Sequence, residues 1–274
     1  MVTDLSEDDL PLARHRFLVK LIQADWEQPD GALRLRRDLQ LAELEHASHF
    51  QNARILLSAL AEGKGAPATA AGNLNRKFAR RMFEAMHMPH ISRESTLRFT
   101  KVINEADVRD LQLLREVCQY GGLIARRQKH FRATARACAL LADEQAGLLY
   151  RHLFLTFFRK LDLRAVFHFR EVPGIQDTLA IILWQLDSVA DAWTPVRGLA
   201  ELVLLPPVLD QLRATMVSEF DTEEWILSGY VLEPLLDFGL IERQKGSEWP
   251  GLGEEDAIRL TPLWRRFLHF APAP

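Results

Sequence analysis

Long apolar runs and cysteines are scarce in this chain of 274 residues. The best apolar run, LAIILWQL at 179–186, is far shorter than the roughly 18 residues that a membrane span needs. The N-terminal MVTDLSEDDLPLARHRFL is acidic, whereas a secretory signal is basic and then apolar. Cys118 and Cys138 lie in helical patterns, and we expect two buried thiols in a reducing compartment. These absences predict a cytoplasmic protein without a membrane partner.

Familiar catalytic motifs are also missing: the sequence has no Gly-x-Ser-x-Gly, no His-Glu-x-x-His and no Cys-x-x-Cys. Gly-Lys-Gly at 63–65 does not fit a phosphate-binding loop, because it follows a helical stretch and its lysine precedes the second glycine. His46 and His49 are one helical turn apart, and they would hold a metal only if a third ligand converged on them. We therefore predict no catalytic residues, no cofactor and no metal. An enzyme with an unrecognised site stays open as a third class of function.

Charge is unevenly distributed along the chain. The formal net charge is −3, yet residues 50–143 hold 16 Lys and Arg against 8 Asp and Glu. The segments on either side are acidic, with 6 basic against 10 acidic residues in 1–49 and 12 against 19 in 144–274. One basic segment is expected if that segment binds a polyanion. The same pattern is expected if an acidic part of the chain covers it.

A repeat gives the clearest indication of the fold. Residues 122–141 read GLIARRQKHFRATARACALL, and residues 239–268 read GLIERQKGSEWPGLGEEDAIRLTPLWRRFL. In each copy Gly-Leu-Ile ends a helix, two strands flank a polar turn, and a threonine begins the next helix. We predict antiparallel hairpins followed by helices at 122–136 and 239–262. A helix before such a hairpin is typical of a winged-helix domain.

The predicted fold is mainly α with short β-hairpins, and two winged-helix-like units are joined by a helical middle region. The predicted boundaries are a helical segment at 1–49, with a helix over 33–47, a basic winged-helix-like domain at 50–143, a helical middle at 144–210, and a second winged-helix-like domain at 211–274. The apolar middle predicts either a core or a homodimer interface. As core residues we expect Leu153, Phe157, Leu183 and Trp184.

Five stretches carry a resemblance to a known family: ATAAGNLNRKF, GGLIARR…RATARACALL, YRHLFLTFF, AWTPVRGLAELVL and GLIERQ…IRLTPLWRRFL. Together they resemble an uncharacterised family of bacterial cytoplasmic proteins, in which a GNL-x-(R/K)-x-(F/L) segment precedes two winged-helix-like units around a helical middle. The resemblance covers roughly residues 50–270. It implies the fold and no activity.

The basic residues of 50–143 form two candidate contact surfaces. Residues 75–86 predict a helix with an apolar face and a basic face, and the first hairpin adds further cations. The candidate nucleic-acid-binding residues are Arg76, Lys77, Arg80 and Arg81 on the helix, and Arg126, Arg127, Lys129 and Arg132 on the hairpin.

We predict from these residues that the chain binds DNA or RNA, and regulation is one function that such binding would serve. The alternative is a protein-interaction or scaffold module that meets an acidic protein partner. One feature weakens the first reading. The helix before the first hairpin, EADVRDLQLLREV, is acidic, although a winged protein usually lays this helix in the major groove.

Overall fold

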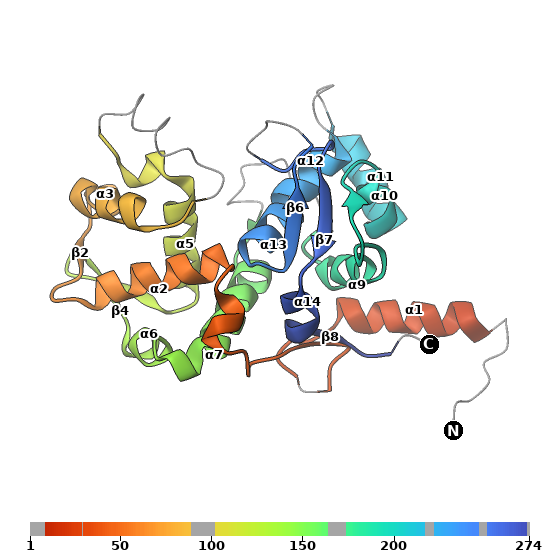
Figure 1. Cartoon of the computed structure of the whole chain (residues 1–274), viewed down its shortest axis with the longest axis horizontal. Helices are drawn as coiled ribbons and strands as arrows, with labels where there is room; N and C mark the ends of the chain where they lie inside the picture. Colours follow the sequence, from red (N-terminus) through yellow and green to blue (C-terminus); the bar gives the residue numbers. More distant parts are fainter. Residues whose placement is uncertain are drawn as a thin grey trace.

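Helices make up most of the molecule, and the strands form small antiparallel sheets. The computed structural model describes residues 9–28, 30–88, 102–163, 174–216, 222–246 and 251–272. Elements from 48–140 gather at one end of the molecule and those from 179–260 at the other, with helix α7 (Ala146–Leu155) between them (Figure 1). The predicted class, mainly α with short hairpins, is confirmed. In the described ranges no helix has the length and apolar character to cross a bilayer.

The first sheet has the strand order β2-β4-β3, with β4 in the middle. Its strands are β2 (Ala66–Pro67), β3 (Ile124–Arg127) and β4 (His130–Ala133). The helices around it are α2 (Ser48–Ala61), α3 (Arg76–Ala85), α5 (Arg109–Tyr120) and α6 (Ala135–Leu140), with the short η2 (Glu105–Asp107) before α5. Gly65 permits the pairing of β2 with β4: its φ is +73°, and a Cβ there would lie 2.1 Å from the carbonyl oxygen of Phe131. The glycines of Gly-Lys-Gly therefore form a tight turn between a helix and a strand.

The second sheet has the matching order β5-β7-β6. Its strands are β5 (Thr194–Pro195), β6 (Ile241–Gln244) and β7 (Ala257–Leu260). Around it lie α9 (Leu179–Val189), α10 (Leu199–Val203), α11 (Pro206–Thr215), α12 (Glu223–Leu227), η5 (Ser228–Leu232), α13 (Glu233–Asp237) and α14 (Pro262–Phe267). Because β5 pairs with β7, this sheet joins residues on both sides of the boundary predicted at 210.

Both predicted hairpins are present. Strand β3 pairs antiparallel with β4 and is followed by α6, and β6 pairs antiparallel with β7 and is followed by α14. The glycines at 122 and 239 take the left-handed conformation, with φ of +70° and +72°. Each helix therefore ends in the way that the Gly-Leu-Ile pattern predicts.

The N-terminal region differs from the prediction. Helix α1 (Asp9–Ile22) is present, but residues 33–47 do not form a helix. Leu33 and Leu35 are buried and Arg34 is exposed, the alternation of a strand, and β1 (Leu33–Leu35) pairs with β8 (Leu268–Phe270). Helical structure is limited to η1 (Leu41–Leu44), followed by α2. The two ends of the chain thus form one sheet, a long-range pairing that local periodicity does not reveal.

An aromatic cluster fills the region between the two sheets. Helix α7, which continues into η4 (Thr156–Lys160), supplies Tyr150 and Phe154, whose rings lie 5.7 and 5.2 Å from that of Phe238. Phe267 lies 4.8 Å from Tyr150 and 5.1 Å from Phe154, which brings α14 onto the same cluster. Edge-on aromatic contacts of this kind stabilise a core beyond the area that they bury.

Most of the expected core is buried, namely Leu153, Phe157 and Leu183. Two expectations are wrong. Trp184 is only partly buried, because its ring packs edge-on against Phe17 of α1 at the margin of the core, with centroids 5.3 Å apart. Cys138 is exposed, because the short helix α6 buries only Ala137. Cys118 is buried, and this burial raises the pKa of its thiol to about 12.

Candidate nucleic-acid interface

Helix α3 presents a basic face to solvent. Asn75 begins the helix, and its side chain accepts a hydrogen bond from the backbone N–H of Phe78 at 2.8 Å. One side of the helix is buried through Phe78, Ala79, Met82 and Phe83. The other side carries Arg76, Lys77, Arg80 and Arg81, all exposed. The division into two faces agrees with the helical periodicity of the sequence.

Three of these four cations have polar partners. Arg76 donates to the side-chain oxygen of Asn104 at 2.9 Å, and Arg80 forms an ion pair of 2.9 Å with Glu84 one turn later. Arg81 lies 3.5 Å from Glu62, a longer ion pair. Lys77 has no ion-pair partner among the described residues. Exposed pairs of this kind contribute little energy, so the arginines remain available to a stronger anion.

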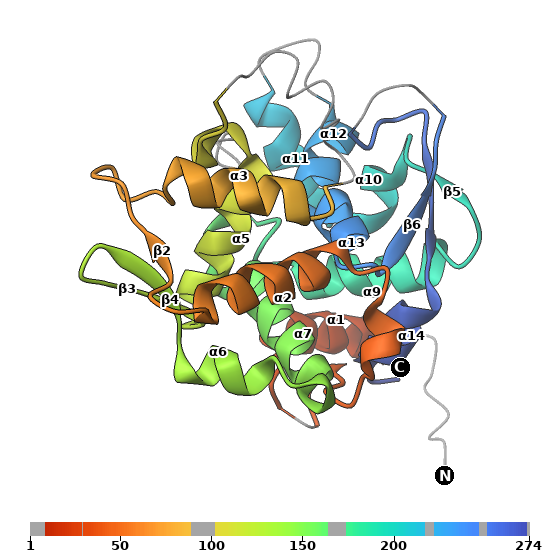
Figure 2. The ribbon, with the colours of Figure 1, turned by 60° about the vertical axis from the view of Figure 1, so that its left-hand side comes forward.

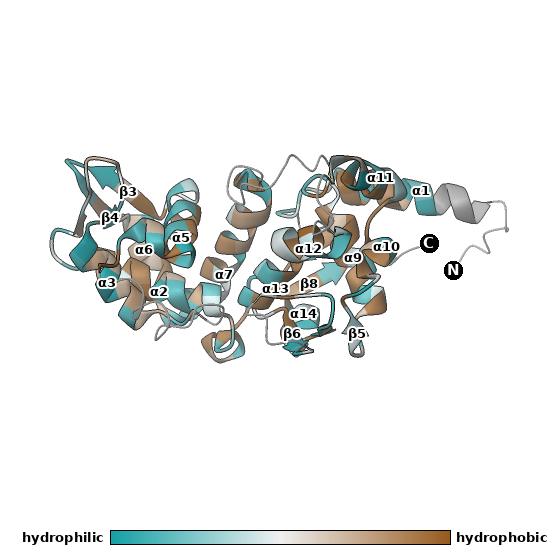
Figure 3. Ribbon diagram, turned by 90° about the horizontal axis from the view of Figure 1, so that it is seen from above, coloured by the Kyte–Doolittle hydropathy of each residue, from teal (hydrophilic) through white to brown (hydrophobic). Residues whose placement is uncertain are grey.

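The hairpin β3–β4 extends the basic surface. Its turn uses positive φ at Gln128 (49°) and Lys129 (61°), and both residues are exposed. A Cβ added at Gly72, in the turn before α3, would lie 3.0 Å from a guanidinium nitrogen of Arg126. Hairpin and helix are therefore neighbours, at the same end of the molecule (Figure 2; Figure 3).

The remaining hairpin cations are exposed as well. Arg127 and Lys129 have no ion-pair partner in the described ranges, and Arg132 donates to the backbone carbonyl of Lys64 at 3.0 Å. Lys64 is itself exposed and lies beside this edge of the sheet. Lys64 is therefore a further surface cation that was not predicted, although its place between two turn-forming glycines was a usable signal.

A buried ion pair anchors α3 to α5. Glu105 accepts a hydrogen bond from the backbone N–H of Leu74 at 2.7 Å through one carboxylate oxygen. The other oxygen accepts from the guanidinium of Arg115, and both side chains are almost fully buried. The Glu105 carboxylate thus links Leu74, two positions before α3, to Arg115 in the middle of α5. Sequence patterns gave no sign of it, since both residues resemble ordinary surface charges.

Helix α5 is enclosed along most of its length. Leu111, Leu114, Arg115, Val117 and Cys118 are buried, and only Arg109 and Tyr120 at its two ends are exposed. At its C-terminal end, the Nε2 atom of His152 on α7 lies 2.7 Å from the carbonyl oxygen of Gly121. The helix that a winged protein usually lays in the major groove is therefore not free to enter a groove here.

In the second hairpin the arginines of β6 and β7 are paired with carboxylates, and the exposed Lys245 after β6 has no ion-pair partner in the described ranges. Arg259 pairs with Glu242 across β6 and β7 at 2.6 Å. Arg243 and Asp256 form a buried pair at 2.8 Å, and the same carboxylate accepts from the backbone of Gly246 and Gly253. Two hairpins of matching topology thus differ in charge: the second pairs its strand arginines with carboxylates, whereas the first carries Arg127 and Lys129 without an ion pair in the described part of the chain.

The two histidines considered as metal ligands are not brought together. His46 is exposed, 3.3 Å from Glu45, whereas His49 is buried between the rings of Phe157 and Phe238. Burial lowers the pKa of His49 to about 4, an effect that the negative charge of Asp237 partly offsets. Within the described residues, no group of three or more His, Cys, Asp or Glu side chains is placed to hold a metal ion.

Comparison with known proteins gives a family match for one part of the chain. No curated protein and no solved structure matches it. Residues 45–146, which include the first sheet, the basic helix α3 and the basic hairpin, match the family model of the Y4jL N-terminal domain. The match covers less than half of the chain and supports its relation to an uncharacterised family through that region.

Proposed function

We propose that the chain binds nucleic acid through one basic surface, and that each of its two three-stranded sheets belongs to a winged-helix-like unit. The basic surface consists of Arg76, Lys77, Arg80, Arg81, Arg126, Arg127, Lys129 and Arg132. The observation that carries the proposal is that all eight side chains are exposed and that the two groups are neighbours. Arg126 of the hairpin lies against Gly72, in the turn that leads into helix α3. No described part of the acidic C-terminal region covers them.

The strand order supports the winged-helix assignment. In both halves a helix precedes the first strand of the sheet, and further helices follow that strand. A hairpin then completes the sheet, because its second strand pairs with the first strand of the sheet. This topology, with the hairpin as the wing, is the one that the Gly-Leu-Ile repeat predicts. It is a fold-level argument and by itself implies no ligand.

The chemistry of the basic surface favours contact with the phosphate backbone. Arginine and lysine on a convex hairpin and an exposed helix face can neutralise phosphates without entering a groove. Because α5 is enclosed, base reading by that helix is not part of the proposal. We therefore expect binding through the wing and α3, with strong salt dependence and little sequence preference.

A salt titration on duplex DNA tests the proposal. The test variant is Lys77→Gln with Arg127→Gln and Lys129→Asn, since these three cations have no ion pair to lose and Asn tolerates the positive φ at position 129. Each cation that contacts phosphate contributes roughly 0.9 to the slope of log affinity against log salt, so the variant is expected to flatten the slope by about 2–3. Its melting temperature is expected to stay close to that of the wild type, because exposed charges contribute little to stability.

The matched control removes exposed arginines from the other end of the molecule, Arg197→Gln with Arg265→Gln. It is expected to leave both affinity and slope unchanged. Wild-type binding weaker than about 100 μM at low salt, on duplex and on single strand, would contradict the proposal, since non-specific binding is normally at least this tight. Loss of a protein partner by the triple variant, without any DNA binding by the wild type, would favour the scaffold alternative.

A further inference from the structure

A second positively charged feature lies away from the basic surface. A cavity of about 570 Å³ opens between residues 26–28, residues 34–38, helix α7 and strand β8. Its lining includes Trp26, Glu27, Arg34, Arg37, Arg151 and His269. A volume of this size is in the range of small-molecule sites. None of these residues belongs to the sequence-predicted surface.

Arg151 is a largely buried charge of the cavity with weak compensation. Its side chain is only 17% exposed, yet the nearest carboxylate, that of Glu27, is 4.0 Å away and itself mostly exposed. One terminal nitrogen donates to the backbone carbonyl of Trp26 at 3.5 Å, and the Nε atom is buried without an acceptor. Burying a cation with so little compensation is costly, and an anion in the cavity would remove that cost.

Trp26 supplies a second unsatisfied donor. The residue is 2% exposed, and its indole N–H is buried with no hydrogen-bond acceptor. Its ring is fixed between Phe154, at 6.1 Å, and the guanidinium of Arg159, at 5.2 Å. A buried indole N–H normally has a partner, so this donor is a second polar group beside the cavity that the described residues leave unsatisfied.

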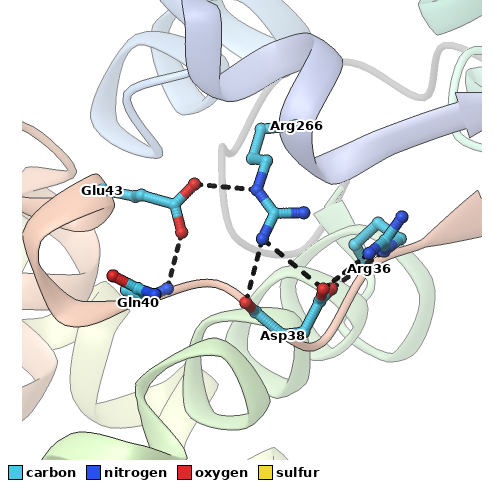
Figure 4. A network of polar contacts seen from close by, with 5 residues as sticks. All are labelled: Arg36, Asp38, Gln40, Glu43 and Arg266. Atoms are coloured by element: carbon cyan, nitrogen blue, oxygen red, sulfur yellow. Dashed lines mark hydrogen bonds and ion pairs between the residues drawn. The ribbon is translucent and has the colours of Figure 1, made fainter.

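The acidic residue at the rim of the cavity is already engaged. Asp38 forms two hydrogen bonds with Arg36, at 2.8 and 2.5 Å, and lies 3.5 Å from Arg266, which also binds Glu43 at 2.8 Å (Figure 4). These arginines hold the pKa of Asp38 far below its usual range, the bond from Arg36 being the largest cause. Asp38 therefore does not neutralise the other cations of the cavity.

The other cations leave an excess of positive charge. Arg34 and Arg37 are exposed and have no ion-pair partner in the described part of the chain. His269 adds a neutral imidazole, because burial and the nearby Arg36 and Arg34 lower its pKa. Beyond the Arg36–Asp38 pair, three guanidinium groups thus line a space to which Glu27 adds one carboxylate, 4.0 Å from Arg151.

The geometry points to a binding site for a small phosphorylated molecule of about nucleotide size. Guanidinium groups recognise phosphate oxygens in a bidentate manner. The site is independent of the proposed nucleic-acid surface, since it shares no residue with it. It would give the chain a small-molecule ligand in addition to any macromolecular partner.

Calorimetric titration of the full chain with AMP, pyrophosphate and adenosine, at constant ionic strength, tests this inference. We expect saturable binding of AMP and pyrophosphate, and binding of adenosine that is at least about tenfold weaker, a difference of roughly 1.4 kcal/mol. The double variant Arg34→Gln with Arg37→Gln is expected to weaken AMP binding at least about tenfold at an unchanged melting temperature, because hydrogen bonds between charged groups are the strong ones and neither residue has an ion pair among the described residues to lose.

Arg127→Gln, on the basic surface, is the matched control and is expected to leave AMP affinity unchanged while weakening DNA binding. Failure of this DNA effect would count against the proposed function and not against the cavity. The inference is overturned if neither AMP nor pyrophosphate binds saturably below about 10 mM. It is equally overturned if AMP binds unchanged to the double variant, or if adenosine binds as well as AMP.

Discussion

The hydroxyl of Thr134 donates to the carbonyl oxygen of Gly122 at 3.0 Å and so connects the end of the first hairpin to the glycine before it. The second hairpin repeats this bond between Thr261 and Gly239 at 2.7 Å. The Thr134 side chain also accepts from the backbone N–H of Ala137, whereas Thr261 makes no such capping bond. The two copies of the repeat thus share one hydrogen bond and differ in a second.

Replacing these threonines by valine keeps their shape and removes the hydroxyl. We expect Thr261→Val to lower the free energy of unfolding by about 1 kcal/mol, and Thr134→Val by about 1–2 kcal/mol because it also loses a cap. Urea denaturation measures both. Ser188→Ala, which removes an exposed hydroxyl with a 3.3 Å bond, is the control and should change stability by under about 0.5 kcal/mol. Equal stabilities for all four proteins would show that the threonine bonds do not hold the hairpins.

The buried pair of Glu105 and Arg115 supports the start of α3, so breaking it should affect both stability and the basic surface. We expect Glu105→Gln to lower the free energy of unfolding by about 3 kcal/mol or more, because Arg115 is then left as a buried charge without its partner. Glu116→Gln is the matched control. Glu116 is 3.5 Å from the same guanidinium but partly exposed, so the expected loss is under about 1 kcal/mol.

A double variant separates charge from packing at this pair. Glu105→Gln with Arg115→Met removes the orphaned cation and should be less destabilised than the sum of the two single variants. Urea unfolding of the four proteins gives the coupling energy. Simple additivity would contradict a direct interaction between the two side chains.

Burial of His49 predicts a loss of stability in mild acid. Its pKa is lowered to about 4 in the folded protein, chiefly by burial, from an ordinary value of 6.5. Between these values the unfolded chain binds a proton at His49 and the folded chain does not. The contribution of His49 to the free energy of unfolding is therefore fully present above pH 6.5 and falls as the pH drops toward 4. From pH 7 to pH 5 the expected loss is about 2 kcal/mol.

The variant His49→Leu removes this titration and keeps a buried apolar side chain. Its stability should fall less than that of the wild type between the same two pH values, as followed by urea midpoints. His152, whose pKa burial also lowers, is present in both proteins and contributes equally. Parallel loss in the two proteins would mean that His49 does not remain neutral when buried.

The sequence predicted the two hairpins because their signals are local: a glycine that must take positive φ, alternating strand residues and a threonine before a helix. The exposed basic face of α3 was predictable for the same reason, since helical periodicity separates it from Phe78 and Met82. The pairing of β1 with β8 was not, because Leu33–Leu35 has no local sign of a partner at Leu268–Phe270.

Buried charge was missed for a related reason. Glu105 and Arg151 are of residue types that usually lie at the surface, and only the three-dimensional arrangement encloses them. The cavity beside Trp26 likewise collects residues from the N-terminal region, α7 and β8, which are far apart in the sequence. Periodicity describes one element at a time and cannot report which elements meet.

The enclosed position of α5 leads to a last prediction, which depends on the proposed function. A protein that touches only phosphates should distinguish poorly between sequences, because phosphate contacts position a protein without reading bases. We expect two unrelated duplexes of equal length and composition to bind with affinities that differ by less than about threefold, against the factor of 10³ or more typical of specific sites. Fluorescence anisotropy at two salt concentrations measures both affinity and salt dependence. The exposed residues at the ends of α5 supply the control: Arg109→Gln with Tyr120→Ala should leave the ratio between the two duplexes unchanged. A preference above about a hundredfold that this double variant abolishes would mean that α5 reads bases after all, and that the helix is released from α7 when DNA binds.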